Sequence, residues 1–167
     1  MVDKQHLELR NAEAMEALGA RIAQALGGRG LVFLAGDLGT GKTTLVRGAL
    51  RHMGHQGAVK SPTFTLVEPY EINSQLVFHF DLYRLGDPGE LEFMGFRDYI
   101  AGDTLCFIEW PERGAGGLPA PDIEVRLEYR GERRGAVIDA ATARGAALLA
   151  AIAGAGHRSG TADPATP

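Results

Sequence analysis

The chain has 167 residues, 45% of them hydrophobic, and a formal net charge of −4. This length and apolar content favour one domain with one packed core, and the acidic balance argues against a chain that holds nucleic acid by charge alone. The single cysteine excludes an internal disulfide. Residues 1–10 lack the apolar core of a signal peptide, and no stretch approaches the about 20 apolar residues of a membrane span. We therefore expect a cytoplasmic protein with no membrane partner.

The N-terminal segment predicts a strand followed by a helix. Leu7 and Leu9 alternate with polar neighbours, which favours a short strand, and Asn11 is a suitable helix N-cap. Apolar residues then recur at helical spacing until two glycines end the pattern: Met15, Leu18, Ile22, Leu26, Gly27 and Gly28.

A glycine-rich loop comes next, after the apolar run 31–35. It fits the phosphate-binding motif G-x-x-x-x-G-K-[ST], and it consists of Gly36, Asp37, Leu38, Gly39, Thr40, Gly41, Lys42 and Thr43, followed by Thr44. A predicted strand enters this motif and a predicted helix, residues 43–53, leaves it, which is the context of a P-loop. Lys42 would reach the β- and γ-phosphates of a nucleotide, and the Thr43 hydroxyl would bind Mg²⁺.

The segment after the P-loop helix carries hydroxyl groups. In P-loop proteins a hydroxyl in this loop often senses the γ-phosphate and Mg²⁺, which makes Ser61, Thr63 and Thr65 candidates for a switch. A turn at Pro62 with hydroxyls bonded to the local backbone explains the same residues equally well.

The middle of the chain predicts a hairpin and a helix. Strands are expected over 65–68 and 76–83 around a turn at 71–74. In the second strand Val77, His79 and Asp81 share one face, a half-exposed pattern that suits an antiparallel or edge strand. A helix over 91–100 should follow an N-cap at Asp87 and be weakened by Gly95.

The remaining pattern predicts a central strand, a hairpin and a last helix. Residues 105–108 are apolar throughout, as in a buried parallel strand, so Cys106 should be buried and inert. A loop over 112–121, strands over 123–129 and 136–140 around a basic turn at 130–135, and a helix from the cap Thr142 to about 152 complete the domain, 1–153. Residues 154–167 lack large apolar side chains and should form a disordered tail.

Two acids end predicted strands where a P-loop metal site needs one. Because ligands of α/β sheets bind beyond the carboxyl ends of the strands, Glu109 and Asp81 should lie near the P-loop. The burial pattern favours Glu109 as the Mg²⁺ partner, with Asp81 acting on the metal's outer shell, the attacking water or a switch. Trp110 is assigned to the core in preference to the site, and Arg134 belongs to an arginine cluster that a solvated turn explains best.

These segments together resemble one family, TsaE, also called YjeE. The resemblance covers about residues 7–152 and rests on the segments 36–44 (GDLGTGKTT), 60–70 (KSPTFTLVEPY), 79–85 (HFDLYRL), 90–95 (ELEFMG) and 108–111 (IEWP). It implies a P-loop NTPase-like α/β fold in three layers: a mostly parallel sheet with antiparallel hairpin strands and helices on both faces, as the residue pattern also indicates. This chain departs from the family pattern at Thr40 and in a longer polar tail.

The resemblance further implies an ATP- and Mg²⁺-dependent ATPase required for threonylcarbamoylation of adenosine 37 in tRNAs that read ANN codons. Its partners would be TsaD and TsaB, with tRNA reached only through their complex, and the carbamoyl bond would be formed elsewhere. Lys42 and Thr43 match the family's phosphate and metal residues, and Asp81 and Glu109 match its metal-site and hydrolysis acids. Ser61, Thr63, Trp110 and Arg134 are switch or partner-linked candidates.

Three other classes share the P-loop. A small-molecule kinase usually has an arginine-rich lid, whereas the basic cluster here is a short turn. A regulatory GTPase needs Asn-Lys-x-Asp, and no Asn in this chain precedes Lys. The third class is a binding module that is controlled by nucleotide but does not hydrolyse it. Such a module uses the same residues as a slow ATPase, so the sequence alone does not distinguish the two.

Overall fold

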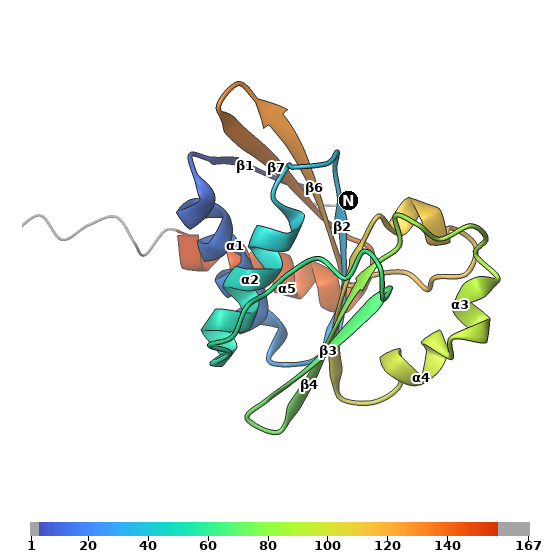
Figure 1. Ribbon diagram of the computed structural model, residues 1–167. Helices are drawn as coiled ribbons and strands as arrows, with labels where there is room; N and C mark the ends of the chain where they lie inside the picture. Colours follow the sequence, from blue (N-terminus) through green and yellow to red (C-terminus); the bar gives the residue numbers. More distant parts are fainter. Residues whose placement is uncertain (1–3, 157–167) are drawn as a thin grey trace, which may run out of the picture.

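The computed structural model describes residues 4–156, which form a twisted seven-stranded sheet between two helical layers (Figure 1). The strands are β1 (Gln5–Leu9), β2 (Gly30–Ala35), β3 (Val67–Ile72), β4 (Gln75–Asp81), β5 (Thr104–Glu109), β6 (Ile123–Arg130) and β7 (Arg133–Ala140). The helices are α1 (Ala12–Leu26), α2 (Lys42–Met53), α3 (Glu90–Phe93), α4 (Phe96–Ile100), α5 (Ala143–Gly156) and a 3-10 turn, η1 (Pro111–Gly114).

The sheet has the order β1-β7-β6-β2-β5-β4-β3. The strands β6, β2, β5 and β4 are parallel to one another, whereas the outer pairings are antiparallel. The predicted α/β fold is therefore confirmed, in the form of a mixed sheet with a parallel centre. The loops that leave β2, β4 and β5 meet at one edge of this centre, because parallel strands end on the same side.

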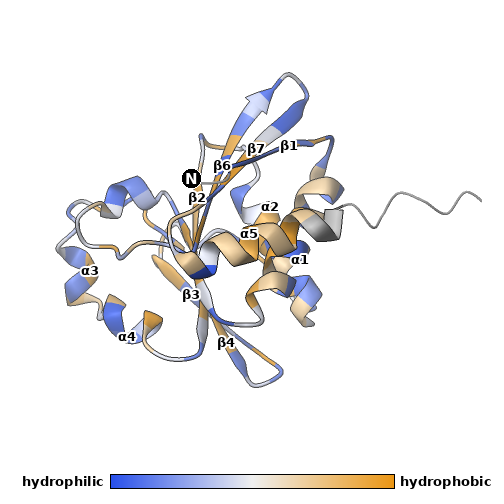
Figure 2. Ribbon diagram, turned by 180° about the vertical axis from the view of Figure 1, so that it is seen from behind, coloured by the Kyte–Doolittle hydropathy of each residue, from blue (hydrophilic) through white to orange (hydrophobic). Residues whose placement is uncertain are grey.

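The helices cover both faces of the sheet, as expected. Helices α1, α2 and α5 lie on one face and the short helices α3 and α4 on the other (Figure 1). Figure 2 shows that the projecting end of the β6–β7 hairpin is mostly hydrophilic. Cys106 is buried in β5, and burial raises the pKa of its thiol to about 11, which agrees with an inert side chain. In the described part of the chain, no helix has the length and apolarity needed to cross a membrane.

Two glycines let the P-loop helix pack closely against α1. A Cβ on Gly48 of α2 would lie 2.0 Å from the carbonyl oxygen of Glu16, and a Cβ on Gly19 of α1 would lie 2.0 Å from that of Leu45. Backbone approaches backbone here, so any larger side chain would push the helices apart. The start of α2, which faces the functional site, is thereby held against a rigid neighbour.

The predicted N-terminal elements are confirmed. The Asn11 side chain caps α1 by accepting a hydrogen bond from the Ala14 amide at 2.9 Å. Gly27 ends the helix in the left-handed conformation with φ of 61°.

The predicted bounds of the first hairpin were wrong. Strand β3 runs on to Ile72, and only Asn73 and Ser74 form the turn, with φ of 51° and 66°. Two successive left-handed residues match the twist of a two-residue hairpin loop. Of the two alternatives predicted for β4, the antiparallel one holds for its pairing with β3, whereas the edge position is wrong, because β4 lies between β3 and β5 and β3 is the edge strand. Pro69 fits this position, since an edge strand has one side without ladder bonds.

Three other boundaries differ from the predictions. Gly95 adopts φ of 73° and separates α3 from α4, so it breaks the expected helix rather than weakening it. The basic segment 130–135 lies mostly in strands, because β6 ends at Arg130 and β7 begins at Arg133. Thr142 caps α5 by accepting from the Gly145 amide at 2.9 Å, and the helix continues to Gly156, into the segment expected to be a tail. Residues 157–167 of that predicted tail lie outside the described residues.

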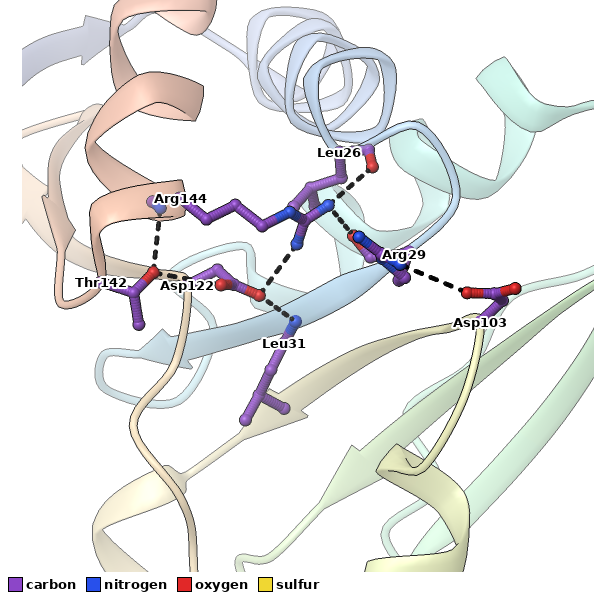
Figure 3. Close-up of polar contacts among 8 residues, drawn as sticks. Leu26, Arg29, Leu31, Asp103, Asp122, Thr142 and Arg144 are labelled. Carbon is purple, nitrogen blue, oxygen red and sulfur yellow. Dashed lines mark hydrogen bonds and ion pairs between the residues drawn. The ribbon is translucent and has the colours of Figure 1, made fainter.

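A polar cluster fastens α5 to the strand that leads into the P-loop (Figure 3). The Asp122 carboxylate accepts from the Leu31 amide at 3.0 Å, from Arg144 at 3.1 Å and from Thr142 at 3.2 Å. Arg144 also donates to the carbonyls of Leu26 and Arg29, at 3.1 and 2.6 Å. One carboxylate and one guanidinium thus join the end of α1 and the starts of β2, β6 and α5.

Replacement of Asp122 by alanine should lower the free energy of unfolding by about 2 kcal/mol, because it leaves half-buried donors without an acceptor. Urea denaturation measures this loss. The control is Asp103→Ala, since the Asp103 side chain is 89% exposed and its one ion pair within residues 4–156 is with Arg29, at 3.5 Å. That variant should stay within about 0.5 kcal/mol of the parent. Equal losses of unfolding free energy in the two variants would show that the Asp122 cluster stabilises the fold no more than an exposed ion pair does.

Candidate functional site

The glycine-rich segment forms the predicted loop between β2 and α2. Gly36, Gly39 and Gly41 have φ of 145°, 78° and 110°, which L side chains rarely adopt. A Cβ on Gly36 would also lie 2.6 Å from the carbonyl oxygen of Leu127. Glycine is therefore required at these positions, and its presence allows the loop to form. The loop delivers the chain into the N-terminus of α2, where free amide groups and the helix dipole favour an anion.

Lys42 is a buried cation without a carboxylate partner in the described chain. Its side chain is 5% exposed, and its ammonium donates to the carbonyl of Gly36 and, at 3.0 Å, to that of Asp37. Burial lowers the pKa of Lys42, and the charges of Glu109 and Asp81 oppose this without forming an ion pair. A desolvated ammonium that meets only neutral carbonyls is suited to receive an anionic ligand.

Trp110 packs against the core, as assigned, and also borders the site. The centroid of its indole ring lies 4.2 Å from Lys42 Nζ, and the Tyr83 ring packs against the same indole with ring centroids 4.9 Å apart. Trp110 has φ of 57°, a left-handed conformation that costs a non-glycine residue about 1 kcal/mol or more. Trp110 follows the last residue of β5, and its left-handed backbone places the indole ring over the Lys42 ammonium.

The predicted acids lie side by side at the ends of neighbouring strands. Asp81 of β4 is the register partner of Glu109 of β5, and both are buried. The Thr43 hydroxyl meets the two carboxylate oxygens of Glu109 at 3.1 and 3.3 Å. Glu109, which the sequence favours as the Mg²⁺ partner, is thus the acid that contacts the P-loop hydroxyl, and its role at a metal stays a prediction.

Asp81 instead anchors the hydroxyl-bearing segment. Its Oδ2 accepts hydrogen bonds from Ser61 and, at 3.4 Å, from Thr63, and its Oδ1 accepts from the Tyr83 amide at 2.9 Å. Thr65 is exposed and lies outside the pocket that the other two hydroxyls line. Of the three switch candidates, Ser61 and Thr63 therefore reach the site and Thr65 does not.

His79 was given a face but no role by the sequence, and the structure places it in the site. Its side chain is fully buried, and Nε2 lies 2.5 Å from Glu109 Oε2. The period of two along β4 had put His79 on the face of Asp81, which was the available signal. The contact itself depends on the register of β4 against β5, which the sequence pattern does not reveal.

Two pockets flank the P-loop. The inner pocket, of about 340 Å³, is lined by Leu38, Gly39, Gly41, Lys42, Thr43, Thr44, Ser61, Thr63, Asp81, Tyr83, Glu109 and Trp110. The outer pocket, of about 180 Å³, is lined by Leu9, Arg10, Asn11, Ala12, Met15, Gly39, Thr40, Gly41, Thr44, Glu132 and Arg134. The predicted site residues thus gather around one loop. Arg134, which stacks on Tyr129 at 4.4 Å, is apart from the switch segment and belongs to the outer pocket.

The residues present fit a nucleotide with its metal ion. The loop offers an unpaired ammonium and a helix N-terminus to phosphate, and Thr43 and Glu109 supply oxygen atoms, the ligands that Mg²⁺ prefers. A metal bound this way would be shared with the phosphates, since Mg²⁺ usually binds one or two carboxylates together with substrate oxygens.

Comparison with known proteins identifies similar sequences and a similar structure. The family model described as "Threonylcarbamoyl adenosine biosynthesis protein TsaE" matches residues 9–136. Over 122 residues the chain is 54% identical to the tRNA threonylcarbamoyladenosine biosynthesis protein TsaE of Haemophilus influenzae, covering 73% of this chain and 77% of that protein. The same protein of Bacillus subtilis is 33% identical over 123 residues, or 73% and 76% of the two chains. The crystal structure of Bacillus subtilis YdiB superposes with a TM-score of 0.78 and 26% identity, over 93% of this chain and 98% of that one.

Replacing Lys42 by alanine should weaken binding of ATP about 100-fold with or without Mg²⁺, because charge-assisted hydrogen bonds contribute up to about 3 kcal/mol. Glu109→Ala should leave Mg²⁺-free binding unchanged and remove the gain in affinity and turnover that Mg²⁺ provides. Calorimetric titration with and without EDTA separates these effects. Lys60→Ala, at an exposed lysine outside the inner pocket, is the matched control. Equal loss of Mg²⁺-free binding in the Lys42 and Glu109 variants would refute the division of roles.

Proposed function

The chain belongs to the TsaE family of tRNA threonylcarbamoyladenosine biosynthesis proteins, and we propose that it acts there as a P-loop ATPase. In this proposal it binds ATP with Mg²⁺ and hydrolyses it in the cytoplasm. The cycle resets a TsaD–TsaB complex between rounds of threonylcarbamoylation of adenosine 37 in tRNAs that read ANN codons. The chain itself does not form the carbamoyl bond. The single observation that carries the proposal is the buried Lys42 ammonium beside two strand-end acids.

The two pockets suggest how a nucleotide would lie. The inner pocket contains Lys42 and both acids, so it would receive the β- and γ-phosphates. The outer pocket continues from the same loop to the start of α1 and offers polar groups from Asn11 and Arg134 beside the thioether of Met15. A polar rim around an apolar side chain suits a nucleoside. ATP is preferred to GTP because the guanine-reading Asn-Lys-x-Asp does not occur in the sequence.

Thr43 and Glu109 would hold the metal. Mg²⁺, when bound, neutralises charge that develops on the phosphates during transfer. Lys42 would leave the carbonyls of Gly36 and Asp37 and donate to phosphate oxygens, which are better acceptors because they carry charge. Asp81 is already bonded to Ser61 and Thr63, so it would transmit the state of the site to their loop.

That loop presents a surface suited to a protein partner. Phe64 is 82% exposed, and the Arg84 guanidinium lies 4.3 Å from its ring. No carboxylate lies within ion-pair distance of Arg84 among residues 4–156, so its donors are free for an acid on the partner. Exposed aromatic and arginine side chains often form the energetic centre of an interface. We assign this surface to the TsaD–TsaB complex, because it is continuous with the loop that Asp81 anchors. The net charge of −4 favours a protein over direct tRNA contact.

Phe64→Ser should abolish stimulation of ATP hydrolysis by TsaD–TsaB and leave the basal rate unchanged, since Phe64 lies outside the inner pocket. Phe93→Ser is the matched control, because Phe93 is 96% exposed on α3 and should not affect stimulation. Steady-state phosphate release with increasing TsaD–TsaB measures both. Full stimulation of the Phe64 variant would place the partner elsewhere.

The function itself is tested by reconstitution. Purified protein should hydrolyse ATP weakly, faster with TsaD–TsaB, and its addition should convert a single round of tRNA modification into multiple rounds. Multiple-turnover modification that proceeds equally without the protein would contradict the proposed role. Binding of ATP without turnover, with or without the partners, would identify a nucleotide-gated binding module instead. Rapid phosphorylation of a metabolite would identify a kinase.

A further inference from the structure

His79 is a buried polar residue that the proposed phosphate chemistry does not use. It lies in β4 two residues before Asp81, pairs in register with Phe107, and has no exposed side-chain surface. It does not line the inner pocket. Its neighbours on the same face include the apolar core residue Val77. Burial of an imidazole lowers the free energy of unfolding unless hydrogen bonds compensate for its lost hydration, and an apolar side chain would pack there without that cost. The presence of histidine here therefore suggests a role for its hydrogen bond.

The one polar partner of His79 in the described chain is Glu109. Since a carboxylate oxygen accepts, Nε2 donates to Oε2, at 2.5 Å, while Nδ1 has no partner among the described residues. Thr43 of the P-loop helix meets both oxygens of the same carboxylate, Oε1 at 3.3 Å and Oε2 at 3.1 Å. The imidazole therefore holds the Glu109 carboxylate beside Thr43 by one of its two oxygens.

Lys42 shows why this restraint matters. Glu109 is the largest favourable charge acting on the Lys42 ammonium, yet the two residues form no ion pair in the part of the chain that the structure describes. A Glu109 side chain free to rotate would gain from pairing with Lys42, since an opposite charge stabilises a desolvated ammonium. That pairing would occupy the cation that phosphate needs and withdraw the acid from the metal site.

We propose that His79 is a positioning residue that fixes the rotamer of Glu109, so that the carboxylate stays beside Thr43 at the Mg²⁺ site and off Lys42. The inference rests on the proposed function for the identity of the ligand. His79 lines neither pocket beside the P-loop, so in this proposal it acts only through the Glu109 carboxylate. Such outer partners of metal-binding groups typically change metal affinity or activity by about 10–100-fold when they are removed.

The test replaces His79 by side chains that differ in where they place a donor. In glutamine the amide nitrogen is as far along the side chain as Nε2, whereas in asparagine it is close to the place of Nδ1; leucine has no donor. We expect His79→Gln to retain the Mg²⁺ dependence of the parent within about threefold. His79→Asn and His79→Leu should need about tenfold more Mg²⁺ for half-maximal effect. Binding of nucleotide in EDTA should be equal in the parent and His79→Gln and weaker in the other two, because Glu109 then competes for Lys42.

Two readouts keep this test separate from the proposed function and from stability. Calorimetric affinity for ADP with increasing Mg²⁺ needs no turnover, so it remains decisive even if the protein hydrolyses no ATP. Val77→Ala, which removes methyl groups from the same face of β4, should lower the melting temperature without changing the Mg²⁺ dependence. Equal Mg²⁺ dependence in the glutamine, asparagine and leucine variants would overturn the proposal. So would a shift in Val77→Ala as large as that in His79→Leu, since His79 would then be merely structural.

Discussion

The rest of the site depends on the burial of the Lys42 ammonium, which forms no ion pair with a carboxylate among residues 4–156. A desolvated cation is costly, and its direct contacts here are the carbonyls of Gly36 and Asp37 and the face of Trp110. Burial lowers the pKa of Lys42, and the charges of Glu109 and Asp81 oppose this lowering without forming an ion pair with the ammonium. The protein thus keeps a positive charge available to an anion. The neighbouring polar groups hydrogen-bond the Glu109 and Asp81 carboxylates, which would otherwise be free to neutralise that charge.

The surrounding fold exists to hold these groups in place. Close packing of α1 on α2 through Gly19 and Gly48 sets the position of the helix N-terminus. The Asp122 cluster fixes the entry of β2 from the other end of the strand. Because β2, β5 and β4 are parallel neighbours, their carboxyl ends bring the P-loop, Glu109 and Asp81 to one edge. Rigid elements therefore carry the phosphate-facing groups. The hydroxyl groups of Ser61 and Thr63 lie on a loop and are bonded to the Asp81 side chain, so this loop is the part suited to change.

The sequence revealed those features that depend on short-range chemistry. Glycine at positions 36, 39 and 41, the apolar strand before them and the caps at Asn11 and Thr142 each leave a local pattern, and each was predicted. The hairpin turn at Asn73 and Ser74 and the helix break at Gly95 were misjudged, because their left-handed conformations are decided by the fit of the flanking elements. The contact of His79 with Glu109 depends on strand register, and the turn of Trp110 onto Lys42 depends on a strained backbone that no periodicity shows.

Trp110 also provides the most direct test of the central claim, that phosphate replaces the protein's own groups around Lys42. It is the only tryptophan of the chain, and its ring lies 4.2 Å from the ammonium. Its fluorescence should change saturably when ATP is added and should respond little to adenosine, which lacks phosphate. Lys42→Ala should remove the response. Emission that is unchanged by ATP, or that changes equally with adenosine, would contradict the account.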